Sequence, residues 1–481
     1  MKKLLFLIGI LSSGLYGASI DHIQTYSPDY LSNQAQTGMI DEVSPYYNPA
    51  GLSRLDKGKY VHLGLQLANG HEKMSYKGKE HKAHLTQLIP NVSLTSVDDN
   101  GAYFFTFGGL AGGGKLEYDG VSGIDVLSDL AQFKPLGVYD KGSTLTGKNL
   151  YEQATLGRAF TINDQLSVSV AGRIVHGSRN LSGTLNIGTN PSTAYKQAKV
   201  QQVTQEVSKA VDAATQGSGL SAAQIAAIKQ QKTTQALTLL QTKMNALQQN
   251  GLSGDLDSKR EAWGYGFQLG VNYKVNDKLN LAARYDSRIK MNFKAKGSEN
   301  QLQTADIIGS NIGLSTFYPQ YAINSKIRRD LPAILSVGAS YKVTDNYLTS
   351  ANYYFNRHAK MDRVTTFGGH EHGRDYKNGW EIALGNEYKL NDKFTLIGSV
   401  NYARTGAKNS SFNDTEYALN SVTLGAGLRY KYDDTLSITG SVAHFIYEKE
   451  DGNFKEKYKV NDNQKYHKEI TAFGLSVTKK F

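Results

Sequence analysis

The chain offers few side chains at spacings that support catalysis or metal binding. Histidines gather in the run His370-Glu371-His372 and in the pair His81 and His84. Neither group has the i, i+4 helical spacing of a zinc-binding pair, so both are interpreted as solvated histidines in or beside outer loops. The sequence contains no cysteine and no Gly-x-Ser-x-Gly nucleophile motif. We therefore expect no catalytic residue, no metal and no cofactor.

Arginines on strand-like segments are the remaining candidates for chemistry. Arg173 lies on the polar face of a segment in which polar and apolar residues alternate. Arg284 and Arg288 are expected to share the inward face of another segment, with Asp286 between them. Guanidinium groups that face an internal cavity could hold the carboxylate head group of a ligand. The alternative is an ion-pair network that only stabilises the interior.

The elements that position these residues belong to an exported chain. Lys2 and Lys3 precede an apolar run, Leu4 to Leu11, and a stretch of small residues up to Ala18. This pattern predicts a signal peptide over residues 1–18. The apolar run is shorter than the roughly 20 residues that a helix needs to cross a bilayer. No later segment is apolar and long enough either, so helical membrane spans are not expected.

Composition indicates a β-barrel more than a soluble protein. The 481 residues are 40% hydrophobic, with 48 Gly, 30 Tyr and only 8 Pro, and the mean hydropathy is −0.44. A barrel that is apolar outside and wet inside has this average, because only one face of each strand meets lipid. The formal net charge of +11 is attributed to contacts with lipopolysaccharide phosphates or to attraction of anionic ligands. A nucleic-acid partner is not expected, since basic residues and stacking aromatics do not gather on one element.

Short polar turns divide the chain into strands. Six of them read Asp98-Asp99-Asn100-Gly101, Asn163-Asp164-Gln165, Asn276-Asp277-Lys278, Thr344-Asp345-Asn346, Asn391-Asp392-Lys393 and Asp433-Asp434-Thr435. Asn and Asp tolerate the left-handed backbone of such turns. The other strand ends are joined by seven longer polar stretches, near residues 70–81, 120–148, 190–260, 298–328, 367–377, 408–415 and 449–466. Short turns on one side and long loops on the other predict fourteen strands, with both termini in the periplasm.

The segment before the first predicted strand carries a family resemblance. It lacks barrel alternation and ends in Asn48-Pro49-Ala50-Gly51. This resembles the FadL/TodX family of outer-membrane long-chain fatty-acid and hydrophobic-compound transporters, whose N-terminal plug carries an Asn-Pro-Ala motif followed by Gly. The resemblance implies an all-β, 14-stranded antiparallel transmembrane barrel over residues 58–481, with residues 19–57 as a plug in its lumen. The alternative for the motif is a simple Asn-Pro turn.

The resemblance also implies a lateral route through the barrel wall. In that family the third strand bends inward and opens a gap. The third predicted strand here contains five glycines within seven positions: Gly108, Gly109, Gly112, Gly113 and Gly114. Glycine inside a strand weakens pairing and permits a bend, in agreement with a lateral opening. The alternative is a flexible strand end near the outer rim.

Residues 193–250 break the β pattern. Ala, Gln, Lys and Leu dominate, and apolar residues recur at spacings of three and four on both sides of Gly217-Ser218-Gly219. The pattern predicts a helical hairpin in the third outer loop, with Ser221 and Gln224 as a capping box. This insert could help to form a ligand groove, cap the barrel passively or present a surface to another partner.

These features favour passive transport across the outer membrane of a Gram-negative-type bacterium. Long-chain fatty acids or similar hydrophobic molecules would bind in the lumen, the plug would shift, and the ligand would leave through the third strand. Outer-membrane lipid and lipopolysaccharide are the other expected partners, and we expect a monomer. The alternatives are a surface adhesin that acts through residues 190–260, and a general hydrophilic porin, against which the plug argues.

Overall fold

The computed structural model describes residues 27–120, 122–131, 133–296, 301–304, 312–313, 324–357, 364–365, 371–372, 377–412 and 417–481. The predicted signal peptide, the first part of the predicted plug and His370 lie outside the described residues.

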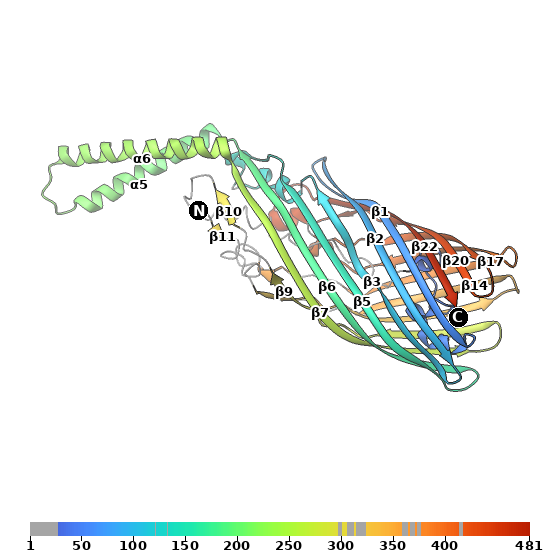
Figure 1. Ribbon diagram of the computed structural model, residues 1–481. Coiled ribbons are helices and arrows are strands. Elements are labelled where there is room, and N and C mark those ends of the chain that lie inside the picture. Colours follow the sequence, from blue (N-terminus) through green and yellow to red (C-terminus); the bar gives the residue numbers. More distant parts are fainter. Residues whose placement is uncertain are drawn as a thin grey trace.

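The described strands close into an antiparallel barrel of fourteen wall segments (Figure 1). The first strand pairs with the second and also with the last, so the sheet has no open edge. In order around the ring, the wall consists of β1 (Gly58–Tyr76), β2 (Lys79–Asp98), β3 (Gly101–Tyr118), β5 (Thr144–Thr161), β6 (Leu166–Thr189), β7 (Leu252–Lys274), β8 (Leu279–Asp286) with β9 (Asn292–Lys296), β12 (Lys326–Arg328) with β13 (Ala333–Lys342), β14 (Tyr347–Arg357), β17 (Gly379–Lys389), β18 (Phe394–Arg404), β19 (Ser421–Lys431), β20 (Leu436–Tyr447) and β22 (Lys465–Lys480). The predicted fold class and strand number are confirmed.

Alternation explains why these segments form a lipid-embedded wall. On β6, Ser169 and Arg173 are buried toward the lumen, whereas Val170 and Ile174 are exposed on the outside. Successive side chains of a strand point to opposite faces, so the outer face becomes apolar while the inner face stays polar. The ladders of the closed ring pair backbone donors with acceptors, as a lipid environment requires, with an exception between β2 and β3 that is described below.

All six predicted short turns lie at one end of the barrel, here called the turn end, and the opposite end is called the loop end. One predicted loop is wrong. Residues 70–81 are mostly strand, because β1 and β2 continue to a two-residue turn at Lys77 and Gly78. Both turn residues have positive φ, 49° and 84°, as a type I′ hairpin turn requires. The prediction was wrong because this stretch has the polar composition of a loop. In the structure it continues the strand, and inward residues such as Met74 are buried.

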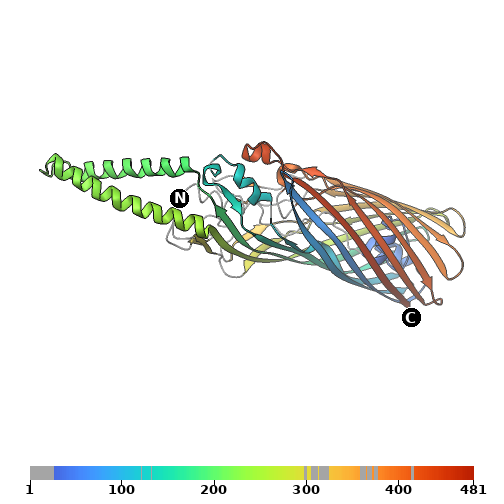
Figure 2. The same cartoon turned by 90° about the horizontal axis from the view of Figure 1, so that it is seen from above.

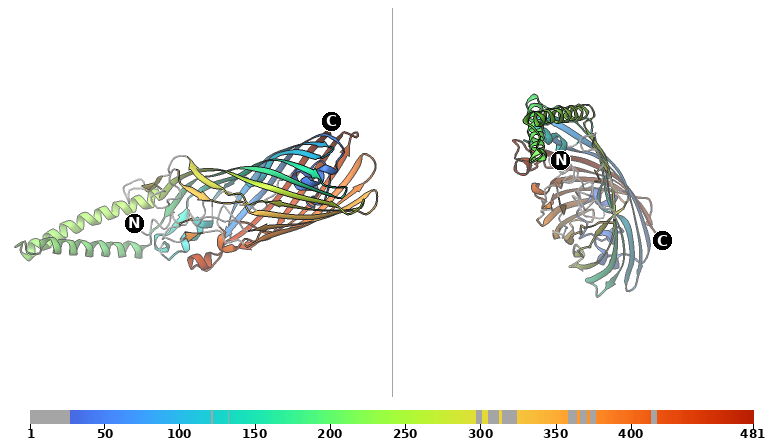
Figure 3. Two further views of the ribbon diagram at one scale, coloured as in Figure 1. Left: turned by 90° about the horizontal axis from the view of Figure 1, so that it is seen from below. Right: turned by 90° about the vertical axis from the view of Figure 1, so that its left-hand side faces the viewer.

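The remaining elements gather mainly at the loop end. Helices α5 (Thr193–Thr215) and α6 (Ala222–Asn250) form the predicted hairpin, and they project away from the barrel (Figures 1, 2 and 3). Ser221 and Gln224 make the predicted capping box. The shorter elements are α4 (Ser122–Asp125), η2 (Val126–Asp129), η3 (Lys134–Leu136), β4 (Val138–Asp140), β10 (Gln301–Thr304), β11 (Ile312–Gly313), β15 (Val364–Thr365), β16 (Glu371–His372), η6 (Asn409–Ser411), β21 (Glu450–Asp451) and α7 (Phe454–Tyr458). Among the described helices, none combines the length and apolar character needed to cross a bilayer.

The described N-terminal segment, residues 27–57, lies inside the barrel near the turn end and is called the plug (Figure 1). It consists of α2 (Pro28–Ser32), α3 (Ser44–Tyr47) and η1 (Pro49–Arg54) with their connections. Its polar backbone is satisfied by inward side chains of the wall. The hydroxyls of Ser167, Ser340, Ser399 and Ser441 donate to the plug carbonyls of Ala50, Gly38, Ser32 and Pro28 at 2.6–2.8 Å.

Gly38 is the point of closest approach between the plug and β13. Its carbonyl accepts from Asn280 Nδ2 at 2.9 Å and from Ser340 Oγ at 2.7 Å. A Cβ atom at Gly38 would overlap the backbone of Ala339. We predict that Gly38→Ala displaces the plug while the barrel still folds, at a cost of about 1–3 kcal/mol, as is typical of overpacking. Faster proteolysis of the plug, with unchanged heat-dependent gel mobility of the barrel, is the expected result.

Gly172→Ala is the matched control, because Gly172 lies on the outer face of β6 with open space around its Cβ position. Equal rates of plug digestion in the two variants would contradict the prediction.

Candidate functional site

The ladder between β2 and β3 is interrupted in the middle of the wall. Leu85 pairs with Leu116 and Asn91 pairs with Gly108, but residues 86–90 and 109–115 have no mutual ladder partners. β3 stays paired with β5 on its other side, with register shifts on both sides of Ala111. The predicted glycine run therefore lies inside the strand, between paired segments, and not at a strand end near the rim.

Glycines let the side chains of β2 fill this interruption. Gly112 and Gly114 have φ values of 121° and 67°, which other residues rarely adopt. A Cβ atom would come within 2.8 Å of Gln87 Oε1 at Gly114, and within 3.0 Å of Ile89 Cγ2 at Gly109. Side-chain packing, and not a hydrogen-bonded ladder, thus closes the wall here.

A group of buried apolar side chains lies directly inside the interruption, and we call it the apolar lumen cluster. Leu110 and Ala111 come from the interrupted part of β3 itself, and both are buried. The other members come from β5 to β9 and from the segment before β13, and they are Tyr151, Val175, Ala262, Ile289, Met291, Phe293 and Leu331.

Arg173 and Arg284 face the lumen, as predicted, and meet at one carboxylate. Arg173 Nη1 lies 3.6 Å from Asp286 Oδ1, and Arg284 Nε lies 3.2 Å from Asp286 Oδ2. Arg173 also donates to Gln153 Oε1 from Nε at 3.0 Å and from Nη2 at 2.6 Å. Gln268 Nε2 donates to Asp286 at 2.8 Å. Arg173, Arg284, Gln153 and Gln268 thus form one buried polar network around Asp286.

This arginine network also contacts the plug. Arg284 Nη1 donates to the carbonyl oxygen of Tyr46 in α3. A charged donor at a helix C-terminus is favourable, because the last carbonyls of the helix lack backbone partners. Arg284 therefore joins the wall, Asp286 and the plug in one set of contacts.

The motif Asn48-Pro49-Ala50-Gly51 holds the plug in place. Asn48 Nδ2 donates to Met39 O and to Asn272 Oδ1, both at 2.8 Å, and Asn48 Oδ1 accepts from Gly51 N at 3.2 Å. Pro49 starts η1, where its missing N–H has no cost. A Cβ atom at Gly51 would lie 2.7 Å from Asn48 Nδ2, so glycine is required there.

The placement of Arg288 on the inward face is wrong. Asp286 and Ser287 are buried in succession, which shifts the alternation by one residue. The Arg288 side chain is consequently 52% exposed on the outside, with Nε 3.6 Å from Asp330 Oδ2. A bulge of this kind changes the face of every later residue, and alternation alone does not reveal it.

The sequence analysis missed four buried cations among the described residues: Arg179, Arg260, Arg329 and Lys468. Arg179 and Arg260 lie directly opposite each other on β6 and β7, and the Arg179 guanidinium is 5.8 Å from the ring centre of Phe293. Lys468 is fully buried, with Nζ 3.2 Å from Glu72 Oε1. Arg179 lies on the same inward face of β6 as Arg173, at another odd-numbered position. The alternation of the sequence could therefore have predicted that Arg179 faces the lumen.

Residues 122–131 and 133–140, called the cover segment, pack over lumen-facing apolar residues at the loop end. Ile124, Leu127 and Phe133 are buried in one cluster with Leu85 and Leu116 of the wall. This association joins a loop to both strands that flank the interruption. No sequence signal marked it.

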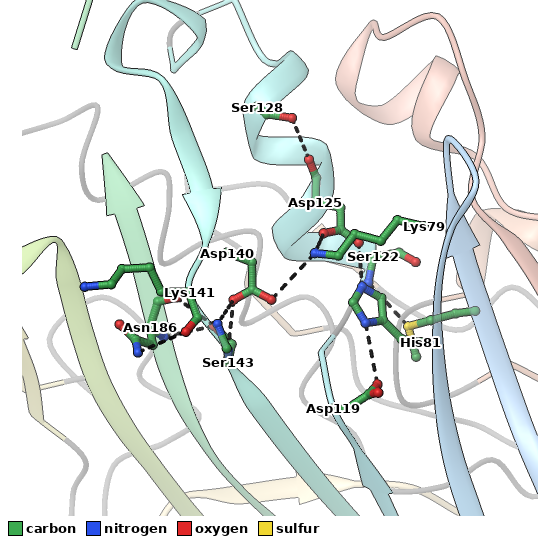
Figure 4. Close-up of polar contacts among 12 residues, drawn as sticks. Lys79, His81, Asp119, Ser122, Asp125, Ser128, Asp140, Lys141, Ser143 and Asn186 are labelled. Atoms are coloured by element: carbon green, nitrogen blue, oxygen red, sulfur yellow. Dashed lines mark hydrogen bonds and ion pairs between the residues drawn. The ribbon is translucent and has the colours of Figure 1, made fainter. Parts of the chain in front are cut away.

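Polar contacts tie the cover segment to the β1–β2 hairpin (Figure 4). Lys79 Nζ lies 2.6 Å from Asp125 and 3.8 Å from Asp140, and His81 Nε2 lies 2.6 Å from Asp125 Oδ2. His81 is buried and is therefore not the solvated histidine that was predicted, whereas His84 is exposed. Burial alone would raise the pKa of the Asp129 carboxyl, but hydrogen bonds from Lys77 and Tyr76 lower the pKa overall.

A polar cavity of about 780 Å³ lies at the turn end, between the plug and strands β17 to β22. Glu42, Arg54 and Asp56 line it from the plug side, and Arg429 and Lys431 line it from the wall. Close by, burial raises the pKa of the Asp41 carboxyl to about 7, against the lowering by Arg429. The plug thus carries a carboxyl group that titrates near neutral pH.

Comparisons with known proteins agree with this architecture. Relatives include the 47 kDa outer membrane protein of Pasteurella multocida, 26% identical over 41% of this chain and 46% of that protein. Outer membrane protein P1 of Haemophilus influenzae is 25% identical over 51% of this chain and 52% of that protein. The long-chain fatty acid transport protein of Escherichia coli O157:H7 is 21% identical over 56% of this chain and 58% of that protein. The chain thus spans about half the length of the curated relatives it matches.

Solved structures share the fold. A FadL homologue of Pseudomonas aeruginosa superposes with a TM-score of 0.66 at 16% identity, covering 96% of this chain and all (100%) of that chain. The toluene transporter TodX of P. putida superposes with a TM-score of 0.64 at 17% identity, covering 95% of this chain and 99% of that chain. The family model described as outer membrane protein transport protein (OMPP1/FadL/TodX) matches residues 137–481. This chain therefore belongs to the FadL/TodX family and is a protein of the outer membrane.

Proposed function

We propose that this chain carries long-chain fatty acids or similar hydrophobic molecules passively across the outer membrane. One observation supports the proposal above the others: the apolar lumen cluster lies directly behind the interrupted ladder between β2 and β3. Membership of a family of outer-membrane transport proteins agrees with transport of hydrophobic compounds. In the same family, one relative is named a fatty acid transport protein and one solved structure a toluene transporter.

The apolar lumen cluster would bind the hydrocarbon part of the ligand. Its members come from neighbouring strands between β3 and β13, and Met291 adds a flexible side chain that can adapt to ligand shape. Each ligand methylene transferred from water into such a site contributes about 0.8 kcal/mol. Leu110 and Ala111 of the interrupted strand belong to the cluster, so a ligand bound there would lie beside the interruption.

The arginine network would bind a carboxylate head group. Arg173 lies one inward position away from Val175 of the cluster on β6, and its Nη1 lies 3.5 Å from Ser287 O, two residues before Ile289. A ligand carboxylate would form charge-assisted hydrogen bonds with Arg173, whose guanidinium now contacts Asp286 and Gln153. Arg288 is not part of this proposal, since it lies outside.

Exit would occur sideways, between β2 and β3. Opening the wall elsewhere breaks a continuous ladder, and unpaired backbone groups in lipid are costly. At residues 86–90 and 109–115 the mutual ladder is already absent, and Pro90 has no N–H to lose. Displacing the side chains of Gln87 and Ile89 is then the main requirement, and Leu88 beside them is exposed on the outer face.

The plug would shift when the ligand binds. A carboxylate that competes for Arg284 weakens its bond to the Tyr46 carbonyl, which gives the ligand different affinities for the two plug positions. The polar cavity beside the plug provides space for movement. We assign the chain no catalytic role, and we expect one chain to act alone because its barrel is already closed.

Surface adhesion is the second candidate function. The hairpin of α5 and α6 projects from the loop end in three views (Figures 1 to 3), and at about 1.5 Å per residue a 29-residue helix exceeds 40 Å. Deleting residues 193–250 separates the two functions. Loss of surface attachment with intact uptake would favour adhesion through the hairpin.

Locking the interruption should block transport. The chain has no cysteine, so the double variant Ile89→Cys/Gly109→Cys would contain a single disulfide. A Cβ atom at Gly109 would lie 3.0 Å from Ile89 Cγ2, so the two positions are close enough to be joined. Oxidation should abolish uptake of a radiolabelled long-chain fatty acid, and a reductant should restore it.

The matched control joins Asn91→Cys and Gly108→Cys, which are direct ladder partners at the edge of the interruption. This second disulfide should leave uptake unchanged. Full uptake by the oxidised double variant Ile89→Cys/Gly109→Cys would refute lateral exit.

Replacing Arg173 should separate head-group binding from tail binding. We expect Arg173→Gln to weaken binding of a long-chain carboxylate about tenfold, as loss of one charge-assisted hydrogen bond predicts. Binding of a neutral hydrocarbon should not change, because Arg173 is not a member of the apolar lumen cluster. Competition with a fluorescent lipid analogue measures both affinities.

Arg158→Gln is the control, since Arg158 lies on the outer face of the neighbouring strand, near Tyr103. If Arg173→Gln weakens the binding of both ligands equally, or weakens the binding of neither, Arg173 is not part of the head-group site.

Docking of the plug should weaken as the pH rises. The pKa of Asp41 is about 7 when docked, against 3.8 as the ordinary value, so the docked state binds a proton more tightly than the released state. Protonation of Asp41 therefore stabilises the docked plug fully below about pH 4, and this stabilisation is lost as the pH rises through 7. Proteolytic protection of the plug should fall over this range and should be independent of pH in Asp41→Asn. If protection in Asp41→Asn falls with pH as it does in the unmodified chain, Asp41 is not the titrating group.

A further inference from the structure

We infer that a lysine cluster on the outer wall, at the loop end of β7, β9 and β12, binds the phosphates of lipid A in the outer leaflet. The inference does not depend on the proposed transport function, because it concerns the lipid-facing side of the barrel. The cluster consists of Lys259, Lys294, Lys296 and Lys326, and each of these residues is exposed. Figure 1 shows β7 and β9 side by side in this part of the wall.

The strand register places like charges directly opposite one another. Lys259 pairs with Lys296 across β7 and β9, and Lys294 pairs with Lys326 across β9 and β12. Directly opposed like charges destabilise a sheet. Two such pairs on adjoining strands therefore need a compensating anion, and the arrangement has no evident benefit for the barrel alone.

Acidic groups of the described chain compensate this charge only in part. Glu261 lies directly opposite Lys294 across β7 and β9 but contacts Lys296, and Asp257 lies 4.0 Å from Lys259. Among the described residues, no ion pair involves Lys294 or Lys326. The nearby Asp330 is fully buried and is occupied by Arg328 at 2.7 Å and by Arg288 at 3.6 Å. The exposed surface of the cluster is therefore positive.

The position of the cluster indicates which anion it meets. On the outer face of β7, Lys259 and Glu261 are followed by Trp263 and Tyr265, which are 62% and 69% exposed. Exposed Trp and Tyr rings mark the boundary between hydrocarbon and head groups on membrane barrels. The lysines lie beyond these rings toward the loop end, which is the outer leaflet side when the short turns face the periplasm.

Phosphate groups fixed in a plane suit this geometry. Lysine ammonium groups on flexible stems reach the head-group layer while their methylenes stay on the wall, and each forms strong charge-assisted hydrogen bonds with phosphate oxygens. Lipid A presents phosphate groups at this depth. Phospholipid and free phosphate share that chemistry, so the test compares all three.

The test uses the full-length barrel in detergent. Binding of diphosphoryl lipid A is compared between the unmodified chain and the double variant K294Q/K326Q, which removes one opposed pair. The control K389Q/K393Q removes two exposed lysines at the turn end. Native mass spectrometry counts the bound lipid, and titration at two salt concentrations gives its affinity.

We expect K294Q/K326Q to lower the affinity for diphosphoryl lipid A about tenfold and to reduce its salt dependence. K389Q/K393Q should bind like the unmodified chain, and dephosphorylated lipid A should bind weakly to all three. Unchanged affinity in K294Q/K326Q would overturn the inference. Equal binding of phosphatidylglycerol vesicles, or full competition by inorganic phosphate at equal concentration, would overturn the assignment to lipid A.

Discussion

A lipid environment supplies no hydrogen bonds, so every backbone donor and acceptor in the wall needs a partner within the protein. The pairing of β1 with β22 meets this requirement by closing the ring. It also makes the interior a separate compartment, where inward serines and asparagines of the wall donate hydrogen bonds to the backbone carbonyls of the plug. The closed ladder is thus the constraint under which both the wall and the plug were selected.

Under that constraint, the break between β2 and β3 is the exception that needs a reason. Backbone groups over residues 86–90 and 109–115 give up mutual pairing, although β1 and β5 still pair with the outer sides of these strands. Glycines with positive φ at Gly112 and Gly114 permit the distortion, and Leu110 turns into the apolar lumen cluster. A wall that needed only stability would continue the ladder with β-branched residues, and the proposed lateral exit gives the departure a reason.

The sequence predicted the barrel well because strand alternation and Asn- or Asp-rich turns are local signals. All six short turns and the fourteen wall segments were found in this way. Features that depend on tertiary packing were not. The bulge at Asp286 and Ser287, which moves Arg288 outside, leaves no local mark. The cover segment is a polar-looking loop whose apolar residues matter only where they meet Leu85 and Leu116. Arg173 and Arg284 were located correctly, but their shared partner Asp286 and the contact with Tyr46 required coordinates.

Charge is distributed differently on the inner and outer faces of the wall between β6 and β12, and we proposed a different anion for each face. Inside, Arg173 and Arg284 share Asp286 within a buried network, where removing one partner leaves an uncompensated charge. Outside, the lysines of β7, β9 and β12 remain exposed and face each other, where individual contacts are weak and several must act together. Rigid arginines therefore suit one ligand that must be bound and released, whereas flexible lysines suit a lipid layer that is always present.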